Sequence, residues 1–93
     1  MRQMTETPLT PVQTRRRRLL FRATHRGSHE TDLLIGGFVG PRIDAMSEPD
    51  MDSLEEVMEM SDADLADWLT GRLPIPADAD SPMLRAIKEA GGK

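Results

Sequence analysis

The segment at residues 15–38 reads RRRRLLFRATHRGSHETDLLIGGF and contains two apolar helical patterns separated by a glycine. Leu19 and Ala23 lie four residues apart, so they can share one face of a helix that we expect over residues 15–25. Gly27 fits the position just past a helix end, where a left-handed backbone is favourable for glycine. The segment therefore predicts two short helices joined by a tight corner.

The second helix has clear start signals. Ser28 is a suitable N-cap for a helix that we expect to run to about Val39. Glu30 and Asp32 fall in its first turn, where the helix dipole favours negative charge. Its core-facing stripe is expected to consist of Leu34, Ile35 and Phe38.

Further helical segments follow. Ser47 and Ser61 are suitable N-caps for a third and a fourth helix, and Ser81 with Pro82 begins the last. Trp68 is expected to be the central core residue of the fourth helix. Neither strict alternation nor a hairpin dipeptide occurs, so the expected fold class is all-α, a compact bundle of four to five short helices. The other apolar positions expected in the core are Met51, Leu54, Val57, Met58, Leu65, Leu69, Leu84 and Ile87.

A length of 93 residues indicates one domain. We expect a disordered N-terminal lead over residues 1–14, a helical domain over residues 15–89 and a flexible tail over residues 90–93. Whether residues 42–50 are helical is left open, because Pro41 precedes this stretch and Pro49 lies within it.

Composition excludes several classes of protein. The absence of cysteine excludes disulfides, zinc-thiolate sites and thiol catalysis. No apolar run approaches the roughly 20 residues that span a bilayer, and the first residues lack the apolar core of a secretory signal. We therefore expect a bacterial cytoplasmic protein that binds no membrane. Residues 1–42 carry a net charge of +5 and residues 43–93 a net charge of −9, which gives a basic end that could steer an acidic partner.

Catalytic and metal chemistry find little support in the sequence. Ser28 and His29 are neighbours, and neighbouring side chains on a helix point in different directions. His25 and His29 have a metal-binding spacing, but Gly27 breaks the helix between them. Residues 36–37 are both glycine inside an apolar pattern, which favours close helix packing over a phosphate loop. We expect no catalytic, cofactor-binding or metal-binding residue, and hence no enzyme.

The four arginines at residues 15–18 could contact phosphates. The chain is acidic overall, however, and its three aromatic residues lie in apolar patterns, which gives base stacking little support. A solvated face that steers a protein partner is the favoured reading, and nucleic-acid binding is the disfavoured alternative.

The corner Arg26-Gly27-Ser28-His29-Glu30 is the best candidate site. It sets a guanidinium and a carboxylate on either side of a tight backbone, with no large side chain at Gly27. Such a surface can approach another backbone closely and offer a donor fork and an acceptor. From physics alone, a mere helix stop at Gly27 is an equally good explanation.

Two blocks of sequence resemble the SdhE/YgfY family of FAD assembly factors, the bacterial counterparts of mitochondrial succinate dehydrogenase assembly factor 2. The family motif R-G-x-x-E is met by Arg26-Gly27-Ser28-His29-Glu30 after an arginine-rich segment, and Asp32 with the following apolar run also matches. The family pattern D-L-x-x-W-L is met by Asp64-Leu65-Ala66-Asp67-Trp68-Leu69. The resemblance covers about residues 14–88, and residues 41–51 depart from it.

The resemblance implies a factor that binds the flavoprotein subunit of succinate dehydrogenase, or of fumarate reductase, and promotes covalent FAD attachment there. Carried over by position, Arg26, Gly27 and Glu30 are partner-binding residues, and Asp32 is a fourth. No cofactor is expected to bind the factor stably, because FAD is attached to the partner. The factor is expected to be a monomer or a weak dimer. A general interaction module, antitoxin-like and with another partner, is the alternative.

Overall fold

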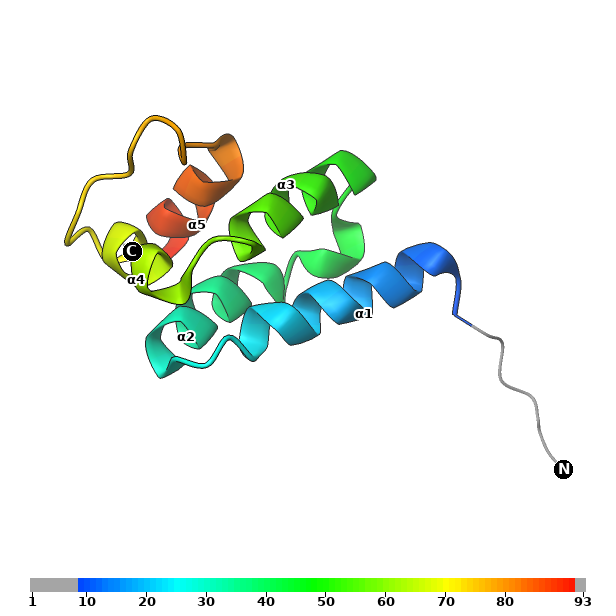
Figure 1. Ribbon diagram of the computed structural model, residues 1–93. Helices are drawn as coiled ribbons and strands as arrows, with labels where there is room; N and C mark the ends of the chain where they lie inside the picture. Colours follow the sequence, from blue (N-terminus) through cyan, green and yellow to red (C-terminus); the bar gives the residue numbers. More distant parts are fainter. Residues whose placement is uncertain (1–8, 92–93) are drawn as a thin grey trace, which may run out of the picture.

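The computed structural model describes residues 9–91, and in this range the chain forms five α-helices, one short 3-10 helix and no strand (Figure 1). The expected all-α class is confirmed. The helices are α1 Pro11–Thr24, α2 His29–Val39, α3 Glu48–Met58, α4 Asp62–Leu69 and α5 Pro82–Gly91, with the 3-10 helix η1 at Ile43–Ala45.

Helix α1 begins four residues earlier than the sequence analysis predicts. Thr10 caps it through a reciprocal pair of bonds: the Gln13 backbone N–H donates to Thr10 Oγ1 at 3.1 Å, and the Thr10 N–H donates to Gln13 Oε1 at 2.9 Å. Pro11 occupies the first turn, where its missing N–H costs nothing. The predicted disordered lead over residues 1–14 is therefore wrong for residues 11–14. Residues 1–8 of that prediction lie outside the described residues.

Helices α1 and α2 form an antiparallel hairpin whose corner holds Gly27 (Figure 1). Gly27 has φ +109°, in the region that favours glycine, as the sequence predicts. Gly36 allows the two helices to approach, because a Cβ there would lie 2.8 Å from Thr24 Cγ2. At the neighbouring Gly37, an added Cβ would have no atom of the described residues within 4 Å outside its own stretch of helix. The interpretation of both glycines as packing glycines is thus right for Gly36 and wrong for Gly37.

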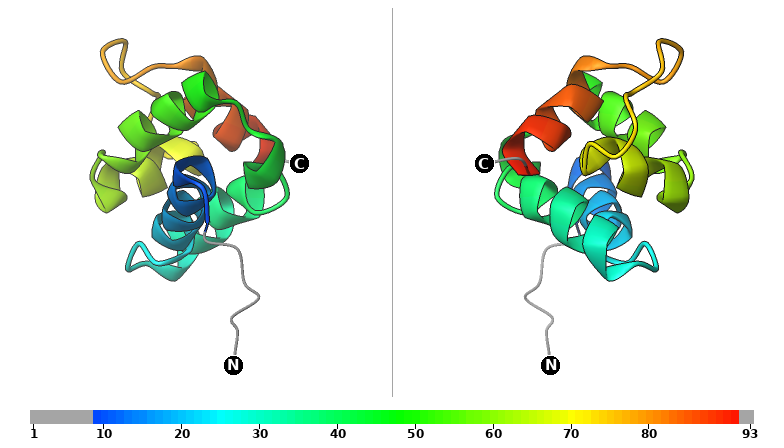
Figure 2. Two further views of the ribbon diagram at one scale, coloured as in Figure 1. Left: turned by 90° about the vertical axis from the view of Figure 1, so that its right-hand side faces the viewer. Right: turned by 90° about the vertical axis from the view of Figure 1, so that its left-hand side faces the viewer.

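The remaining helices close the bundle. Helix α2 packs on both α4 and α5, and α3 packs on α1 and α5. Viewed along α1, α2 and α3 lie on different sides of it (Figure 2). The N-caps predicted for α3 and α4 are confirmed: Ser47 Oγ accepts from the Asp50 N–H and Ser61 Oγ from the Asp64 N–H. Residues 43–45 form η1, and helix resumes at Glu48.

The core lies between the five helices, and every core position expected in α3 and α5 is buried. Trp68 departs from the expectation, because it is only half-buried at the edge of the core. Leu65 and Leu69 lie four residues apart and occupy the inward line of α4, so Trp68 falls beside that line. In α2, Leu34 is likewise half-buried, whereas Ile35 and Phe38 are buried as expected.

Helix α5 extends to Gly91, so the predicted flexible tail over residues 90–93 is wrong for residues 90–91. Gly91 packs closely on Leu34 of α2, since an added Cβ would lie 2.7 Å from Leu34 Cδ2. Residues 92–93 lie outside the described residues. Within the described part of the chain, no helix has the length and apolar character needed to cross a membrane.

Candidate docking site

The Arg26 side chain turns into the protein at the corner between α1 and α2. Its Nε donates to Asp62 Oδ1 at 3.1 Å, at the start of α4. Its two terminal nitrogens donate to the main-chain carbonyls of Met58 at 3.0 Å and Met60 at 2.8 Å, where α3 ends. Only 11% of the side chain is exposed. The planar fork of a guanidinium suits three separate acceptors, so Arg26 ties the first corner of the bundle to the α3–α4 corner.

Asp62, the ion-pair partner of Arg26, also accepts a hydrogen bond from α2. Thr31 Oγ1, in a residue with no exposed surface, donates to Asp62 Oδ1 at 2.7 Å. Burial raises the pKa of Asp62, but hydrogen bonds from Thr31, Arg26 and Ser28 and the positive charge of Arg26 outweigh burial, so the pKa lies below its ordinary value. Asp62 is therefore a carboxylate at neutral pH, and it holds α2 and the corner together.

The turn itself is closed by Asp32. The backbone N–H of Arg26 donates to Asp32 Oδ1 at 2.6 Å across six residues. Ser28 caps α2 as predicted, because its Oγ accepts from the Thr31 N–H at 3.2 Å. With Asp32 and Ser28 satisfying backbone groups on either side, Gly27 is left as an exposed point of main chain with open space where a side chain would stand.

Glu30, unlike Arg26, is open to solvent. Its side chain is 48% exposed, and the nearest cation is Arg72, whose nitrogen lies 3.6 Å from the carboxylate. Arg72 Nε itself donates to Asp67 Oδ1 at 3.0 Å. This hydrogen bond to Asp67 is the main reason that the pKa of Arg72 is raised. An exposed ion pair of this length contributes little to stability. The Glu30 carboxylate is thus available to a cation from another molecule.

The arginine run at residues 15–18 is divided between internal and external roles. Arg15 pairs with Asp52 at 2.6 Å and with Glu55 at 3.0 Å, both on α3. Arg16 donates to the Met46 carbonyl at 3.0 Å. Arg17 and Arg18 are exposed, and in the described part of the chain no carboxylate lies within 4.0 Å of either.

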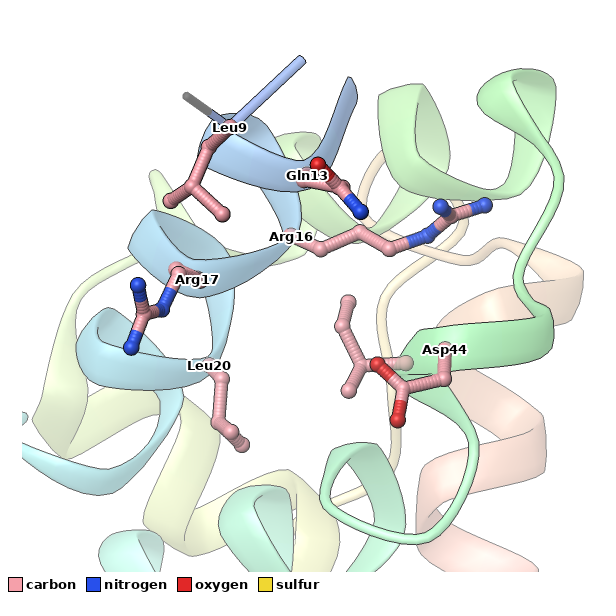
Figure 3. A pocket seen from close by; sticks show the side chains of 7 residues that line it. Leu9, Gln13, Arg16, Arg17, Leu20 and Asp44 are labelled. Atoms are coloured by element: carbon pink, nitrogen blue, oxygen red, sulfur yellow. The ribbon is translucent and has the colours of Figure 1, made fainter. Parts of the chain in front are cut away.

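Figure 3 shows the hollow that Arg16 and Arg17 line together with Leu9, Gln13, Leu20 and Asp44, about 420 Å³ in volume. The Asp44 carboxylate points into this hollow (Figure 3), and an acid at that place opposes the entry of a phosphate. With half of the run engaged internally, the surface left for nucleic acid is small.

Comparison with known proteins identifies the family. The family described as the flavinator of succinate dehydrogenase matches residues 17–90. The chain belongs to this family. It is 53% identical over 78 residues to the FAD assembly factor SdhE of Acetobacter pasteurianus, which covers 84% of this chain and 72% of that protein. It is 31% identical over 84 residues to mitochondrial succinate dehydrogenase assembly factor 2-B of Drosophila erecta, and it spans about half the length of that relative.

The family match contains all four residues predicted to bind the partner, and the structure gives them different surroundings. Glu30 and Gly27 are presented to solvent, whereas Arg26 and Asp32 make internal bonds. Binding of the partner by any of the four stays a prediction.

Several residues of the candidate docking site cannot be found from the sequence alone. Asp62 is separated from Arg26 by 36 positions and Thr31 from Asp62 by 31, so no local pattern reveals their contact. Arg72 reaches Glu30 from the loop after α4. Asp62 carries a local signal only for its place in the first turn of α4, where acids are favoured.

Proposed function

We propose that this chain is a non-catalytic assembly factor that binds the flavoprotein subunit of succinate dehydrogenase, or of fumarate reductase, and promotes covalent attachment of FAD to it. The observation that carries the proposal is the match of residues 17–90 to the flavinator family, which includes the whole corner from Arg26 to Glu30. The factor would act in the bacterial cytoplasm, as a monomer or weak dimer.

The geometry favours a binding role over a chemical one. Ser28 is engaged as an N-cap, and the His25 ring stacks on Phe21 with centroids 3.9 Å apart. In the described residues no group of three or more histidines and acids is placed to hold a metal ion. What the corner offers is an exposed backbone at Gly27 and an exposed carboxylate at Glu30, on a turn that Arg26 ties to the rest of the bundle. These are features of a docking surface.

The factor would act by stabilising the arrangement of the subunit in which flavin attachment occurs. A difference of about 1.4 kcal/mol in binding between two arrangements shifts their ratio tenfold. FAD would stay with the flavoprotein, whose own groups would supply the bond-forming chemistry, and the factor would leave without a cofactor. The exposed Arg17 and Arg18 would speed the approach of an acidic surface.

The test is a deletion of the gene in its own organism, with covalent flavin on the flavoprotein subunit read by in-gel fluorescence. We expect the subunit to be present but poor in covalent flavin, and the wild-type gene to restore it. Normal covalent flavin in the deletion strain would refute the proposal. Capture of defined partners without any flavoprotein among them would instead favour a general interaction module.

A further inference from the structure

Two adjacent glycines in α2 have different surroundings, and only one is explained by the fold. Gly36 lies against Thr24 of α1, as described above. Gly37 is exposed, and outside its own stretch of helix no atom of the described residues lies within 4 Å of the place where its Cβ would stand. A glycine in a helix interior costs about 0.5–1 kcal/mol relative to alanine. Packing within the described chain does not account for Gly37.

A shallow hollow of about 200 Å³ lies beside Gly37, between α2 and α5. Its lining side chains are apolar, although main-chain polar atoms also reach its surface. Leu33 at its edge is 62% exposed, the most exposed of the large apolar side chains in the described chain. A single exposed leucine is ordinary, but an exposed leucine beside an open apolar hollow is a surface suited to an apolar side chain from outside. The lining residues are Leu33, Leu34, Gly37, Phe38, Ala90 and Gly91.

The hollow is continuous with the corner. Glu30, Leu33 and Gly37 occupy positions i, i+3 and i+7 of α2, which share one face of a helix. At 1.5 Å per residue, Gly37 lies about 10 Å along the helix from Glu30. One face of α2 therefore presents an available carboxylate at one end and an apolar recess about two turns away.

We propose that the docking surface extends from the Gly27 corner along this face of α2. The hollow beside Leu33 and Gly37 accepts a bulky apolar side chain of the flavoprotein subunit, and a lysine or arginine about 10 Å away on the same partner surface meets Glu30. The charge argument rests on Glu30, whose nearest cation is 3.6 Å away and already bound by Asp67. This inference rests on the proposed function, since it names the chemistry of the partner at the same site.

The experiment measures the dissociation constant of the purified full chain for the purified flavoprotein subunit. Leu33→Ser removes the exposed apolar side chain, and Gly37→Leu fills the hollow with a good helix former. We expect each to weaken binding about tenfold or more. The unfolding midpoint should be unchanged or higher for Gly37→Leu and slightly lower for Leu33→Ser, because leucine is a better helix former than either glycine or serine. Phe21→Ser is the matched control, because Phe21 is 61% exposed on α1 and does not line the hollow, and it should change binding less than twofold.

The outcomes separate the two proposals. If the wild-type chain does not bind the flavoprotein subunit, the proposed function fails, and this inference fails with it. If the wild-type chain binds and both Leu33→Ser and Gly37→Leu bind equally well, the inference alone is overturned. Self-association of the wild-type chain that Leu33→Ser abolishes, seen by sedimentation equilibrium, would assign the face to a second copy and would also overturn the inference.

Discussion

Arg26 and Glu30 belong to one five-residue motif, yet the structure uses them in opposite ways. The Arg26 side chain is 11% exposed and bonds to three acceptors at the α3–α4 corner. The Glu30 side chain is 48% exposed and has only a long ion pair with Arg72. The motif therefore combines a residue that holds the fold with a residue whose side chain is open to solvent. Loss of function at the two positions should then have different physical causes.

Arg26→Ala is expected to have the largest effect on stability. It leaves Asp62 without its cation and removes the donors to two main-chain carbonyls, at a cost of about 2–4 kcal/mol. Urea unfolding followed by circular dichroism measures it. Arg26→Lys is the control, because it keeps the charge but cannot reach three acceptors at once, and it should lose an intermediate amount. An unfolding free energy within 0.5 kcal/mol of wild type for Arg26→Ala, about the size of an ordinary surface effect, would contradict the internal role.

Gly27→Ala is expected to follow, with a loss of about 1–2 kcal/mol. The cause is the backbone, because φ is +109° and there is open space for the added methyl group. Thermal unfolding measures the loss. Gly37 in α2 provides the comparison. Gly37→Ala should raise the free energy of unfolding by about 0.5–1 kcal/mol, since the backbone at Gly37 is helical and there is space for the methyl group. A Gly27→Ala variant as stable as wild type would show that the corner relaxes without strain.

Acid should weaken the stabilising contribution of the Arg26–Asp62 ion pair. The folded-state pKa of Asp62 is lowered from an ordinary value of 3.8, so its contribution is fully present above that value and is lost as pH falls through the folded pKa. Each tenfold change in proton affinity is worth about 1.4 kcal/mol. The difference in unfolding free energy between wild type and Asp62→Asn should therefore shrink as pH falls below about 4. A difference that is constant with pH would show that the charge of Asp62 contributes nothing.

Glu30→Ala is expected to have the smallest effect on stability, within about 0.5 kcal/mol, because its ion pair is exposed and long. The same urea titration that detects Arg26→Ala should fail to distinguish Glu30→Ala from wild type. A loss comparable with that of Arg26→Ala would remove the distinction between the two sides of the corner.

The helices are predictable where their signals are local. Ser28, Ser47 and Ser61 each cap the helix that begins immediately after them, and Gly27 ends the first pattern, so these boundaries follow from neighbouring residues. The start of α1 has the same kind of signal, since Thr10 and Gln13 form a capping box. The predicted start at residue 15 instead follows the beginning of the arginine run. Helix periodicity alone fails for Trp68, because it does not say which of several apolar residues points inward.

The site is only half predictable. Gly27 and Glu30 lie where a local corner places them, and their exposure follows from it. The inward direction of Arg26 depends on acceptors in α3 and α4 that are 32 to 36 positions away. A lone sequence holds no pairing information over that separation. The exposed face of α2 beyond Glu30 depends equally on where α5 packs.

The most direct test of the central claim is covalent flavin on the flavoprotein subunit in a strain whose only copy of this factor carries Glu30→Ala. This variant separates a loss of docking from a loss of stability, because it should fold and accumulate like wild type. We predict that soluble factor is unchanged while in-gel flavin fluorescence of the subunit falls close to that of the deletion strain. Wild-type fluorescence with Glu30→Ala at wild-type abundance would contradict the claim that this face of the corner docks the partner.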